Sequence, residues 1–493
     1  MGVKESSPPV AARFHSRRTR RTSPARRALG PGGVDMDACF GVTRRSRTRP
    51  SLCSPTIGGN MARMLRRRTG LLALTLLTAS LASAWAGERD RDDFRGDPSL
   101  ERTRDRHPGF GTLDGRPPMV IAHRGASGYF PEETLEAYRL AIAMGVDVIE
   151  PDLVVTKDGV LIARHDVTLN TSTNVADHPE FASRKRAGEN GDGEPVAADW
   201  FVCDFTLAEL KTLGAKSPNH PVAQAYDGLF RIATFQEILD LIKLKAKETG
   251  RVVAVYPETK NPSYHLKLWT GGQIPARMED TLVAMINANG LNHRDAPIFV
   301  QSFEPTSLQY MRGIGSVVRQ VQLIDAYDVD FKTGKMIYGT DAAHRVYSQP
   351  TDWKLAGRNE LFDSMLTPAG LARIRTYADG IGPWKPMIVP VKCKLDAGGE
   401  CMDLDGNGTF DGYPDAIQQA PTSLVADAHR AGLFVHEYTF RSEKGFYNVP
   451  FDAKGDPVKE YLTHYRLGVD GLFTDAADTA LLARTKFERE VAR

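Results

Sequence analysis

Residues 120–138 read VIAHRGASGYFPEETLEAY, and this stretch decides the fold. An apolar run ends at the titratable pair His123 and Arg124, and two glycines follow before a helix-like segment opens at an acidic Pro-Glu-Glu turn. In parallel α/β barrels a strand presents functional side chains at its carboxyl end, where a loop leads into the next helix. The stretch therefore predicts a barrel strand with titratable groups at its mouth.

The alternation of short apolar runs and amphipathic segments continues from this stretch to residue 474. We expect strands near residues 119–122, 147–153, 252–257, 297–301, 318–323, 379–383, 433–437 and 470–474. Segments with apolar residues at helical spacing lie at residues 133–144, 234–247, 276–289, 304–312, 367–377 and 415–431. Eight parallel strands with intervening helices predict an α/β fold, a (β/α)8 TIM barrel, over residues 117–485.

Three stretches do not follow the alternation. Residues 170–226, rich in Asn, Asp, Gly and Pro, form a predicted insertion after the second strand. Residues 324–366 and 385–414 are predicted long loops on the face where the strands end. Long loops inside a compact domain are often functional.

The amino-terminal region differs in charge from the rest of the chain. Residues 1–86 carry 16 Lys and Arg against 3 Asp and Glu, which leaves 47 basic and 58 acidic residues afterwards. The body therefore has a net charge of about −11, which argues against nucleic acid as a partner.

Residues 61–86, MARMLRRRTGLLALTLLTASLASAWA, combine a cationic start, an apolar core and small residues, as secretory signal peptides do. A membrane anchor is the alternative, but the apolar core is shorter than the ~20 residues of a spanning helix. We expect cleavage after Ala84 or Ala86, a disordered or wrongly assigned leader at 1–60 and a linker at 87–116. The mature chain is then periplasmic or secreted without a stable membrane anchor, and both the general and the twin-arginine export routes stay open.

Three cysteines follow the predicted cleavage site, and export exposes them to an oxidising compartment. This context favours a disulfide between Cys393 and Cys401 across a short loop, and it leaves Cys203 without a predicted disulfide partner.

Carboxylates stand at the ends of two neighbouring predicted strands. Glu150 and Asp152, in VIEPDLVV, are two residues apart and point to the same side, and Glu258 ends the next strand in VYPETK. Buried together they would repel each other unless a cation joined them, so they read as ligands for Ca²⁺, with Mg²⁺ as the alternative. The competing interpretation is a salt-bridge network with Arg124, Lys260 or Lys385.

Two histidines accompany these carboxylates, His123 in HRG and His165 in RHD. A neutral and a protonated imidazole on opposite sides of a phosphate act as general base and general acid near pH 7. Either histidine alone would read as a buried structural residue, but the pair at strand ends favours catalysis. Arg124 adds a planar cation suited to a phosphodiester oxygen.

Together, HRG, ExD, HD and ExK across residues 119–480 closely resemble the glycerophosphodiester phosphodiesterase family. GYFPE, the segment ADWFVCDFTLAELKTL and the late VHEYTFRSE resemble its periplasmic, calcium-using branch. The resemblance implies a barrel that cleaves deacylated phospholipids to sn-glycerol 3-phosphate and an alcohol. It assigns His123 and His165 as the acid/base pair, and the metal to Glu150, Asp152 and Glu258.

The resemblance also places substrate-binding residues. Arg124 and Lys260 are expected on the phosphate side of the site, with Gln301 at the end of the fourth strand. Phe303, Trp384 and Tyr438 are expected to line the glycerol or head-group pocket, with core packing as the alternative. Glu133 and Pro151 depart from the family pattern, but neither change alters a proposed ligand, so the catalytic assignment stands.

The implied mechanism uses the glycerol hydroxyl next to the phosphodiester as the nucleophile. One histidine withdraws its proton and the other protonates the leaving alcohol, and water then opens the cyclic phosphate. The sequence does not decide which histidine is the base.

A second calcium signal lies in CMDLDGNGTFDGYPDA, residues 401–416. Oxygen-bearing side chains alternate, with Gly408 at the sixth position, as in an EF-hand loop. Pro414 occupies the twelfth position, so Asp415 would have to replace the usual glutamate and open a helix. The expected ligands are Asp403, Asp405, Asn407, Thr409, Asp411 and Asp415, and a solvated acidic turn is the alternative.

Two other functions are weighed against the glycerophosphodiesterase. A related exported phosphodiesterase for lysophospholipid or a teichoic-acid-type polymer predicts an exposed apolar patch, of which the sequence gives no sign. A surface protein that has lost catalysis predicts a missing histidine or carboxylate, and none is missing. The oligomeric state stays open.

Overall fold

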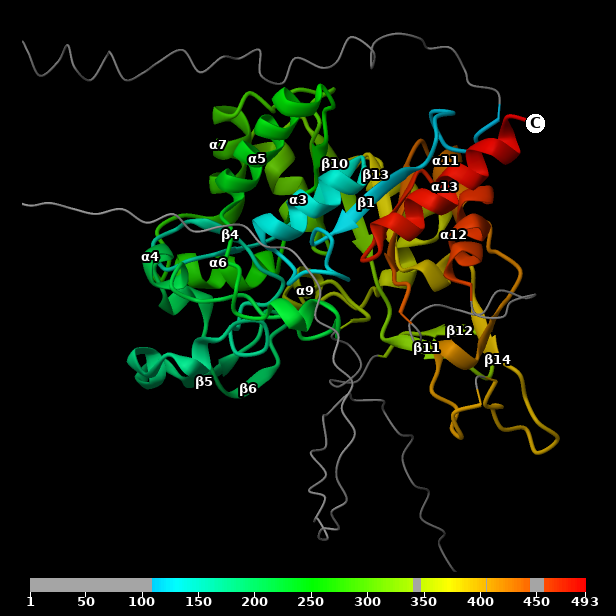
Figure 1. Ribbon diagram of the computed structural model, residues 1–493, viewed down its shortest axis with the longest axis horizontal. Helices are drawn as coiled ribbons and strands as arrows, with labels where there is room; N and C mark the ends of the chain where they lie inside the picture. The colour runs from blue at the N-terminus through cyan, green and yellow to red at the C-terminus, as the bar shows by residue number, and fades with distance from the viewer. Residues whose placement is uncertain (1–108, 340–346, 405, 444–455) are drawn as a thin grey trace, which may run out of the picture. The chain divides into compact units, whose positions relative to one another are not determined.

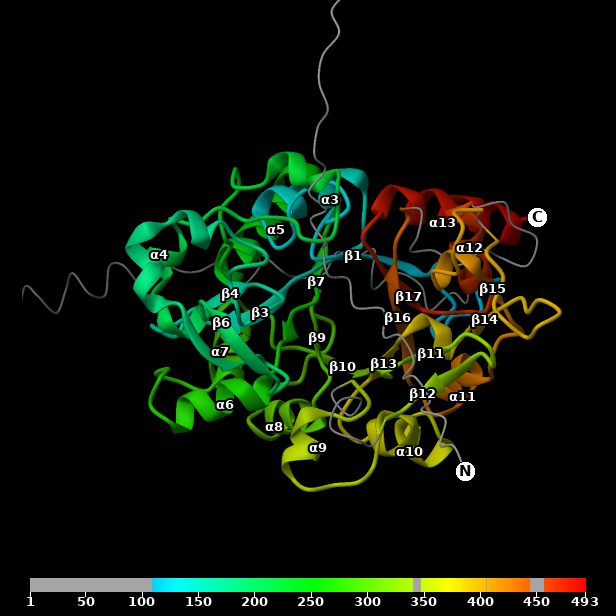
Figure 2. The same ribbon diagram turned by 90° about the horizontal axis from the view of Figure 1, so that it is seen from below.

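The computed structural model describes residues 109–339, 347–404, 406–443 and 456–493, and its centre is a parallel β-barrel (Figures 1 and 2). Six strand positions are uninterrupted: β1 (Met119–His123), β9 (Phe299–Ser302), β10 (Arg319–Ile324), β13 (Gly380–Pro383), β16 (Phe434–Phe440) and β17 (Gly471–Thr474). Two are interrupted: β2 with β3 (Val148–Glu150, Asp152–Val155) and β7 with β8 (Ala254–Val255, Glu258–Thr259). The predicted (β/α)8 fold class is confirmed.

The sheet closes into a barrel because the pairs at its two edges, β3–β8 and β2–β7, are halves of the same two interrupted strand positions. Its hydrogen-bonded order is β4-β3-β8-β9-β10-β13-β16-β17-β1-β2-β7. Only Pro151 separates β2 from β3, and the backbone N–H groups of Tyr256 and Glu258 donate to the carbonyls of Ile149 and Pro151 across the breaks. The pairs β2–β7 and β3–β8 are therefore halves of one ladder. Proline cannot donate to a ladder, which explains the breaks at Pro151 and Pro257.

Helices follow most of the strands and contact the sheet or one another. They are α3 (Leu135–Met144), α5 (Phe235–Thr249), α6 (Pro262–Thr270), α7 (Met278–Ala288), α8 (Pro305–Gly313), α10 (Pro368–Ile374), α11 (Leu424–Arg430), α12 (Pro457–Arg466) and α13 (Ala477–Val491). Thr234 and Glu237 form a capping box that starts α5, and Gly250 ends it in the left-handed conformation. The predicted helix at 415–431 is shorter than expected, because a strand, β15 (Ala416–Gln418), occupies its first residues.

Short hairpins project from the loops, and Figure 1 shows β5, β6, β11, β12 and β14 low in the view. β4 (Leu161–Ala163) pairs antiparallel with β3, and the 170–226 segment contains the hairpin β5–β6 (Arg186–Glu189, Pro195–Asp199) and α4 (Leu207–Leu210). The later loops hold β11–β12 (Asp328–Asp330, Lys335–Ile337), α9 (Thr351–Leu355) and β14–β15, where β14 is Val391–Cys393. Cys393 and Cys401 are disulfide-bonded as predicted, and Cys203 is free and buried.

Strand periodicity separates a hydrophobic barrel interior from a polar mouth. A cluster inside the barrel includes Ile121, Val148, Tyr256, Phe299 and Phe473. Because strand side chains alternate between faces, the residue two positions further along points to the same side. In this barrel those residues are polar, and they are His123, Glu150, Glu258, Gln301 and Asp475.

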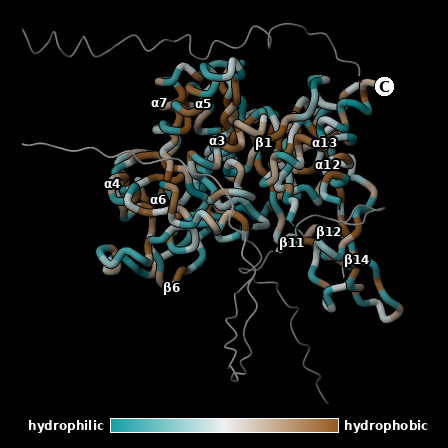
Figure 3. The backbone as a smooth tube through the Cα atoms, in the orientation of Figure 1, coloured by the Kyte–Doolittle hydropathy of each residue, from teal (hydrophilic) through white to brown (hydrophobic). Residues whose placement is uncertain are grey.

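A larger hydrophobic core lies between the strands and the helices. Figure 3 shows hydrophobic residues recurring along β1 and along helices such as α5 and α13. Among the described residues, no helix is both long enough and apolar enough to cross a membrane.

Some predictions fall outside the described residues. These are the leader at 1–60, the signal peptide at 61–86, most of the 87–116 linker, and Asp405 of the second calcium loop.

Candidate active site

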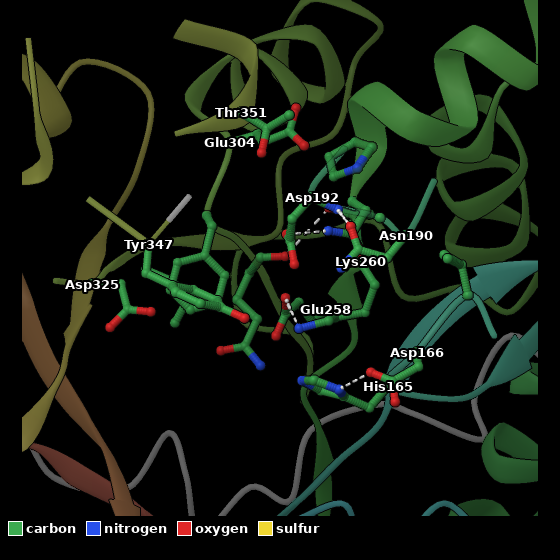
Figure 4. Close-up of a pocket in the computed structure, with 18 of the residues that line it drawn as sticks. His165, Asp166, Asn190, Asp192, Glu258, Lys260, Glu304, Asp325, Tyr347 and Thr351 are labelled. Atoms are coloured by element: carbon green, nitrogen blue, oxygen red, sulfur yellow. Dashed lines mark hydrogen bonds and ion pairs between the residues drawn. The ribbon is translucent and has the colours of Figure 1, made fainter. Parts of the chain in front are cut away.

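A cavity of about 490 Å³ opens at the carboxyl ends of the barrel strands. Its floor includes His123 and Arg124 of the first strand, with Glu258 and Lys260 of the third. Figure 4 shows Glu258, Lys260 and His165 lying close together. Other sides are formed by Asn190 and Asp192 of the β5–β6 turn and by Asp325 and Tyr347 of the later loops. The predicted insertion therefore contributes a wall of the cavity.

Three buried carboxylates meet at this floor. Glu150, Asp152 and Glu258 each offer an oxygen, and these oxygens lie within 4.8 Å of one another. The strand register brings them together, because Asp152 pairs with Glu258 across the second and third strand positions. Among the residues that the structure describes, no other group of three His, Cys, Asp or Glu side chains is placed to hold a metal.

The carboxylates of this cluster raise one another's pKa values, because they are buried and carry like charges. Burial raises the pKa of Glu150 well above its usual range, and the charges of Asp152 and Glu133 raise it further. Burial also raises the pKa of Glu258, to about 8. The Asp152 carboxyl is buried too, yet Lys260 and Arg124 hold its pKa below the usual value. The cluster therefore takes up protons where it lacks a cation, and its hard oxygen donors suit Ca²⁺ or Mg²⁺.

Two of the three basic residues considered for a salt-bridge network lie at the cluster. Arg124 Nε lies 2.9 Å from Asp152 Oδ2, and Lys260 Nζ lies 3.0 Å from Glu258 Oε1. Lys385 instead pairs with Glu460 at 2.9 Å. Arg124 and Lys260 carry two positive charges against three carboxylates, so when all three carboxylates are ionised the cluster keeps an uncompensated negative charge that a bound cation would offset.

Glu133 lies directly beside the cluster. Its Oε1 accepts a hydrogen bond from the backbone N–H of Asp152 at 2.9 Å, and its Oε2 accepts one from the hydroxyl of Tyr138. The carbonyl of Pro151 likewise accepts from the backbone N–H of Glu258 at 2.9 Å. Glu133 and Pro151 thus contact the backbone of two proposed ligands, although neither is itself a ligand of the cluster.

Both predicted histidines line the cavity, and each ring is held by an aspartate. His123 Nδ1 lies 2.7 Å from Asp475 Oδ1, and His165 Nδ1 lies 2.7 Å from Asp166 Oδ1. Burial and the neighbouring Arg124 lower the pKa of His123, although Asp475 opposes the shift. In each ring Nε2 is left to exchange a proton with a bound molecule.

The remaining predicted substrate-binding residues divide into two groups. Gln301, Phe303 and Tyr438 line the cavity, and Gln301 Nε2 donates to Glu150 Oε1 at 2.9 Å. The structure places Trp384 against the ring of Tyr413, at a centroid distance of 6.1 Å, and not in the cavity lining. Trp384 packs in a small hydrophobic cluster with Val391 and Ala416 of the β14–β15 hairpin, which fits the alternative of core packing.

The second calcium loop is built by internal hydrogen bonds. The Asp403 carboxylate accepts from the backbone N–H groups of Gly406 and Gly408, both at 2.6 Å. Asp415 accepts from Leu404 at 2.6 Å and is followed by a strand, β15, so the expected helix after the loop is absent from these described residues. Asn407, Thr409 and Asp411 are exposed in the same loop. Calcium binding at this loop stays a prediction.

The amino-acid sequence matches the glycerophosphoryl diester phosphodiesterase family over residues 123–479, which is more than half of the chain. The chain belongs to this family. It is 38% identical over 372 residues to glycerophosphodiester phosphodiesterase GDPD6 of Arabidopsis thaliana, covering 73% of this chain and 83% of that protein. It is 30% identical over 375 residues to a glycerophosphodiester phosphodiesterase of Haemophilus influenzae, covering 74% and 88%.

Among solved structures, the glycerophosphodiester phosphodiesterase of Agrobacterium tumefaciens aligns with a TM-score of 0.41 at 16% identity, over 74% of this chain and 99% of that one. Membership in the glycerophosphodiester phosphodiesterase family identifies the chain as a phosphoric diester hydrolase.

Sequence reasoning missed several residues of this glycerophosphodiester phosphodiesterase site. Asp475, which holds His123, is the residue directly after the eighth predicted strand, in GLFTDA. Its place at a strand end was the available signal. Asn190 and Asp192 gave no such signal, because only the folded hairpin brings them to the cavity.

Proposed function

We propose that this family member hydrolyses glycerophosphodiesters, the deacylated phospholipids, to sn-glycerol 3-phosphate and an alcohol with two histidines as general acid and general base. One observation carries the proposal. Glu150 and Glu258 of the carboxylate cluster and both aspartate-held histidines line one cavity, with Asp152 buried beside them, at the barrel face where such folds place their active sites.

Proton transfer falls to the two imidazoles. Nε2 of one ring accepts the proton of the glycerol hydroxyl next to the phosphodiester, and that oxygen forms a bond to phosphorus. Nε2 of the other ring donates a proton to the oxygen of the leaving alcohol as its bond to phosphorus breaks. Water then opens the cyclic phosphate with the roles of the two rings reversed.

Arg124 and Lys260 orient the phosphodiester. Both side chains are largely buried at the cluster and are fixed by carboxylates, Arg124 by Asp152 and Lys260 by Glu258. A planar guanidinium and an ammonium group offer several N–H donors to phosphoryl oxygens. Because the nucleophile belongs to the glycerol half, the alcohol needs only to leave, which supports a broad range of head groups.

Glu150, Asp152 and Glu258 would hold a divalent cation. We propose Ca²⁺, as in the periplasmic branch that the sequence resembles, with Mg²⁺ as the alternative; a bound ion of this kind polarises phosphoryl oxygens and offsets their charge. The support is chemical, since all three groups are hard oxygen donors and two of them have raised pKa values where they face one another.

We also propose that the protein is exported. The support is the cationic and apolar segment at 61–86, with its small residues before Ala84 and Ala86, and the disulfide between Cys393 and Cys401, which suits an oxidising compartment.

A coupled assay for release of sn-glycerol 3-phosphate from glycerophosphocholine tests the proposed function. The wild type is expected to be active, and a chelator or the substitution His123→Ala should each lower kcat at least about a hundredfold. Activity that survives both treatments would refute the mechanism.

A further inference from the structure

Three neighbouring barrel strands end at the same level. Phe440 of β16 pairs with Thr474 of β17, which in turn pairs with Ala122 of β1. The next residue on each strand is therefore also adjacent to its neighbour, and these residues are Arg441, Asp475 and His123. The register thus places a carboxylate between a permanent cation and a catalytic histidine.

Asp475 uses both carboxylate oxygens. Oδ1 accepts a hydrogen bond from His123 Nδ1 at 2.7 Å and from the hydroxyl of Ser127 at 3.1 Å. Oδ2 lies 3.3 Å from His220 Nε2 and 3.4 Å from Arg441 Nε. Its side chain is only 5% exposed, so little water competes for these contacts.

The charge of Asp475 determines where the proton of His123 lies. Burial raises the pKa of the Asp475 carboxyl, but His123 and His220 lower it well below its usual range. An ionised carboxylate only accepts hydrogen bonds, so Nδ1 of His123 must carry the proton. Nε2 is then the free nitrogen that faces the reaction.

His220 comes from the insertion and has no other role in the mechanism. Its side chain is 3% exposed and lies between two carboxylates, with Nδ1 2.5 Å from Glu443 Oε1 and Nε2 toward Asp475. Burial lowers its pKa, yet the hydrogen bonds to Asp475 and Glu443 outweigh burial and raise the pKa to about 9. His220 is therefore a cation at neutral pH and donates from both nitrogens.

The second histidine is held differently. Its partner Asp166 is the next residue in the chain and has a side chain that is 45% exposed. Only His123 is thus tied into a buried network that spans the insertion and three strands.

We propose that Asp475 is a positioning residue for His123, and that His220 of the insertion, together with Arg441, fixes Asp475 in place. The inference rests on the proposed acid/base function of His123. It gives the insertion a part in catalysis beyond forming a wall of the cavity.

The test is a double-mutant cycle on kcat and KM for glycerophosphocholine with Asp475→Asn, His123→Ala and the double variant. Asp475→Asn should lower kcat by about 10² to 10⁴ and shift the pH profile of kcat/KM, while KM changes by less than about threefold. The double variant should be no slower than His123→Ala alone, because Asp475 acts through that ring. His220→Gln should lower kcat about tenfold in the wild-type background and not at all in the Asp475→Asn background.

Asp478→Asn is the matched control, since Asp478 is exposed, accepts a hydrogen bond from Tyr129 and lies in the first turn of α13, just after Asp475. The kcat of this variant should stay within about twofold of the wild type. If His123→Ala keeps wild-type activity, the proposed function itself fails. If His123→Ala is inactive but Asp475→Asn keeps its kcat, or the two losses multiply, the positioning role is overturned.

A measurement on the wild type covers the case in which Asp475→Asn does not fold. Nuclear magnetic resonance of the histidine ring nitrogens should show His123 protonated at Nδ1. Protonation at Nε2 alone would overturn the inference.

Discussion

Replacing Glu258 with Gln should stabilise the metal-free protein and weaken its response to metal. The amide oxygen can still accept from Lys260, which lies 3.0 Å from the present Oε1. The substitution removes the negative charge of Glu258, whose candidate ligand oxygen lies within 4.8 Å of those of Glu150 and Asp152. Two like charges at that distance repel each other by about 3.5 kcal/mol at an effective dielectric constant of ~20.

The pH dependence follows from the pKa of Glu258, which is raised to about 8 in the folded protein. The folded state resists ionising this group, so the penalty is absent below the unfolded pKa of about 4.5 and complete above about pH 8. In chelator, the free energies of unfolding of Glu258→Gln and the wild type should therefore be nearly equal at pH 4.5. At pH 8 that of Glu258→Gln should be higher by about 4 kcal/mol.

Thermal unfolding with and without calcium measures the second half of this prediction. Saturation at about 100 times Kd stabilises the wild type by about 2.7 kcal/mol, whereas the variant lacks one ligand and gains less. The comparison of the two proteins cancels calcium bound anywhere else, including the 403–415 loop. The reasoning is refuted if calcium does not change the difference in free energy of unfolding between Glu258→Gln and the wild type. It is refuted too if that difference, measured in chelator, is the same at pH 4.5 and pH 8.

Three other substitutions have defined outcomes. His165→Ala should lower kcat by about 10² to 10⁴ with an unchanged melting temperature, as steady-state kinetics and calorimetry would show; a kcat within threefold contradicts its role. The pKa of His220 is raised to about 9, so the protonated ring adds about 3 kcal/mol to the free energy of unfolding below pH 6.5, and this contribution is lost as pH rises through 9. Denaturant unfolding should show the wild type more stable than His220→Gln by about that much at pH 6 and hardly more stable at pH 10. Burial lowers the pKa of His265 to about 3, so the free energy of unfolding of His265→Leu should exceed that of the wild type by about 2 kcal/mol at pH 5 and by less at pH 8. A larger excess at pH 8 than at pH 5 would show that the ring is not buried in its neutral form.

The barrel could be predicted from the sequence because short apolar runs alternate with amphipathic helical segments, and several of these runs end in a titratable residue. The pattern also located Glu150, Asp152, Glu258 and His123, since strand ends of a closed barrel must converge. His165 instead follows β4, a hairpin strand that pairs antiparallel with β3. Nothing in the local sequence distinguishes Asp152, which stays ionised, from Glu150, which takes up a proton. That difference comes from Arg124 and Lys260 and exists only in the folded site.

The parts that could not be predicted are those where irregular segments meet the barrel. Trp384 could equally line the pocket or pack in the core, and the structure packs it against Tyr413 beside the β14–β15 hairpin. His220 lies in a stretch without periodicity, and only its contacts with Asp475 and Glu443 reveal its place beside the active site. Long-range contacts of this kind leave no trace in residue spacing.

The central claim is that the imidazoles activate the substrate's own glycerol hydroxyl, and phosphorus-31 magnetic resonance tests it most directly. Glycerophosphocholine and an analogue with hydrogen in place of the hydroxyl next to the phosphodiester would be followed with the wild-type enzyme. The account predicts a transient cyclic phosphate from the first substrate and at least about a hundredfold slower cleavage of the analogue. Cleavage of both at similar rates would contradict it.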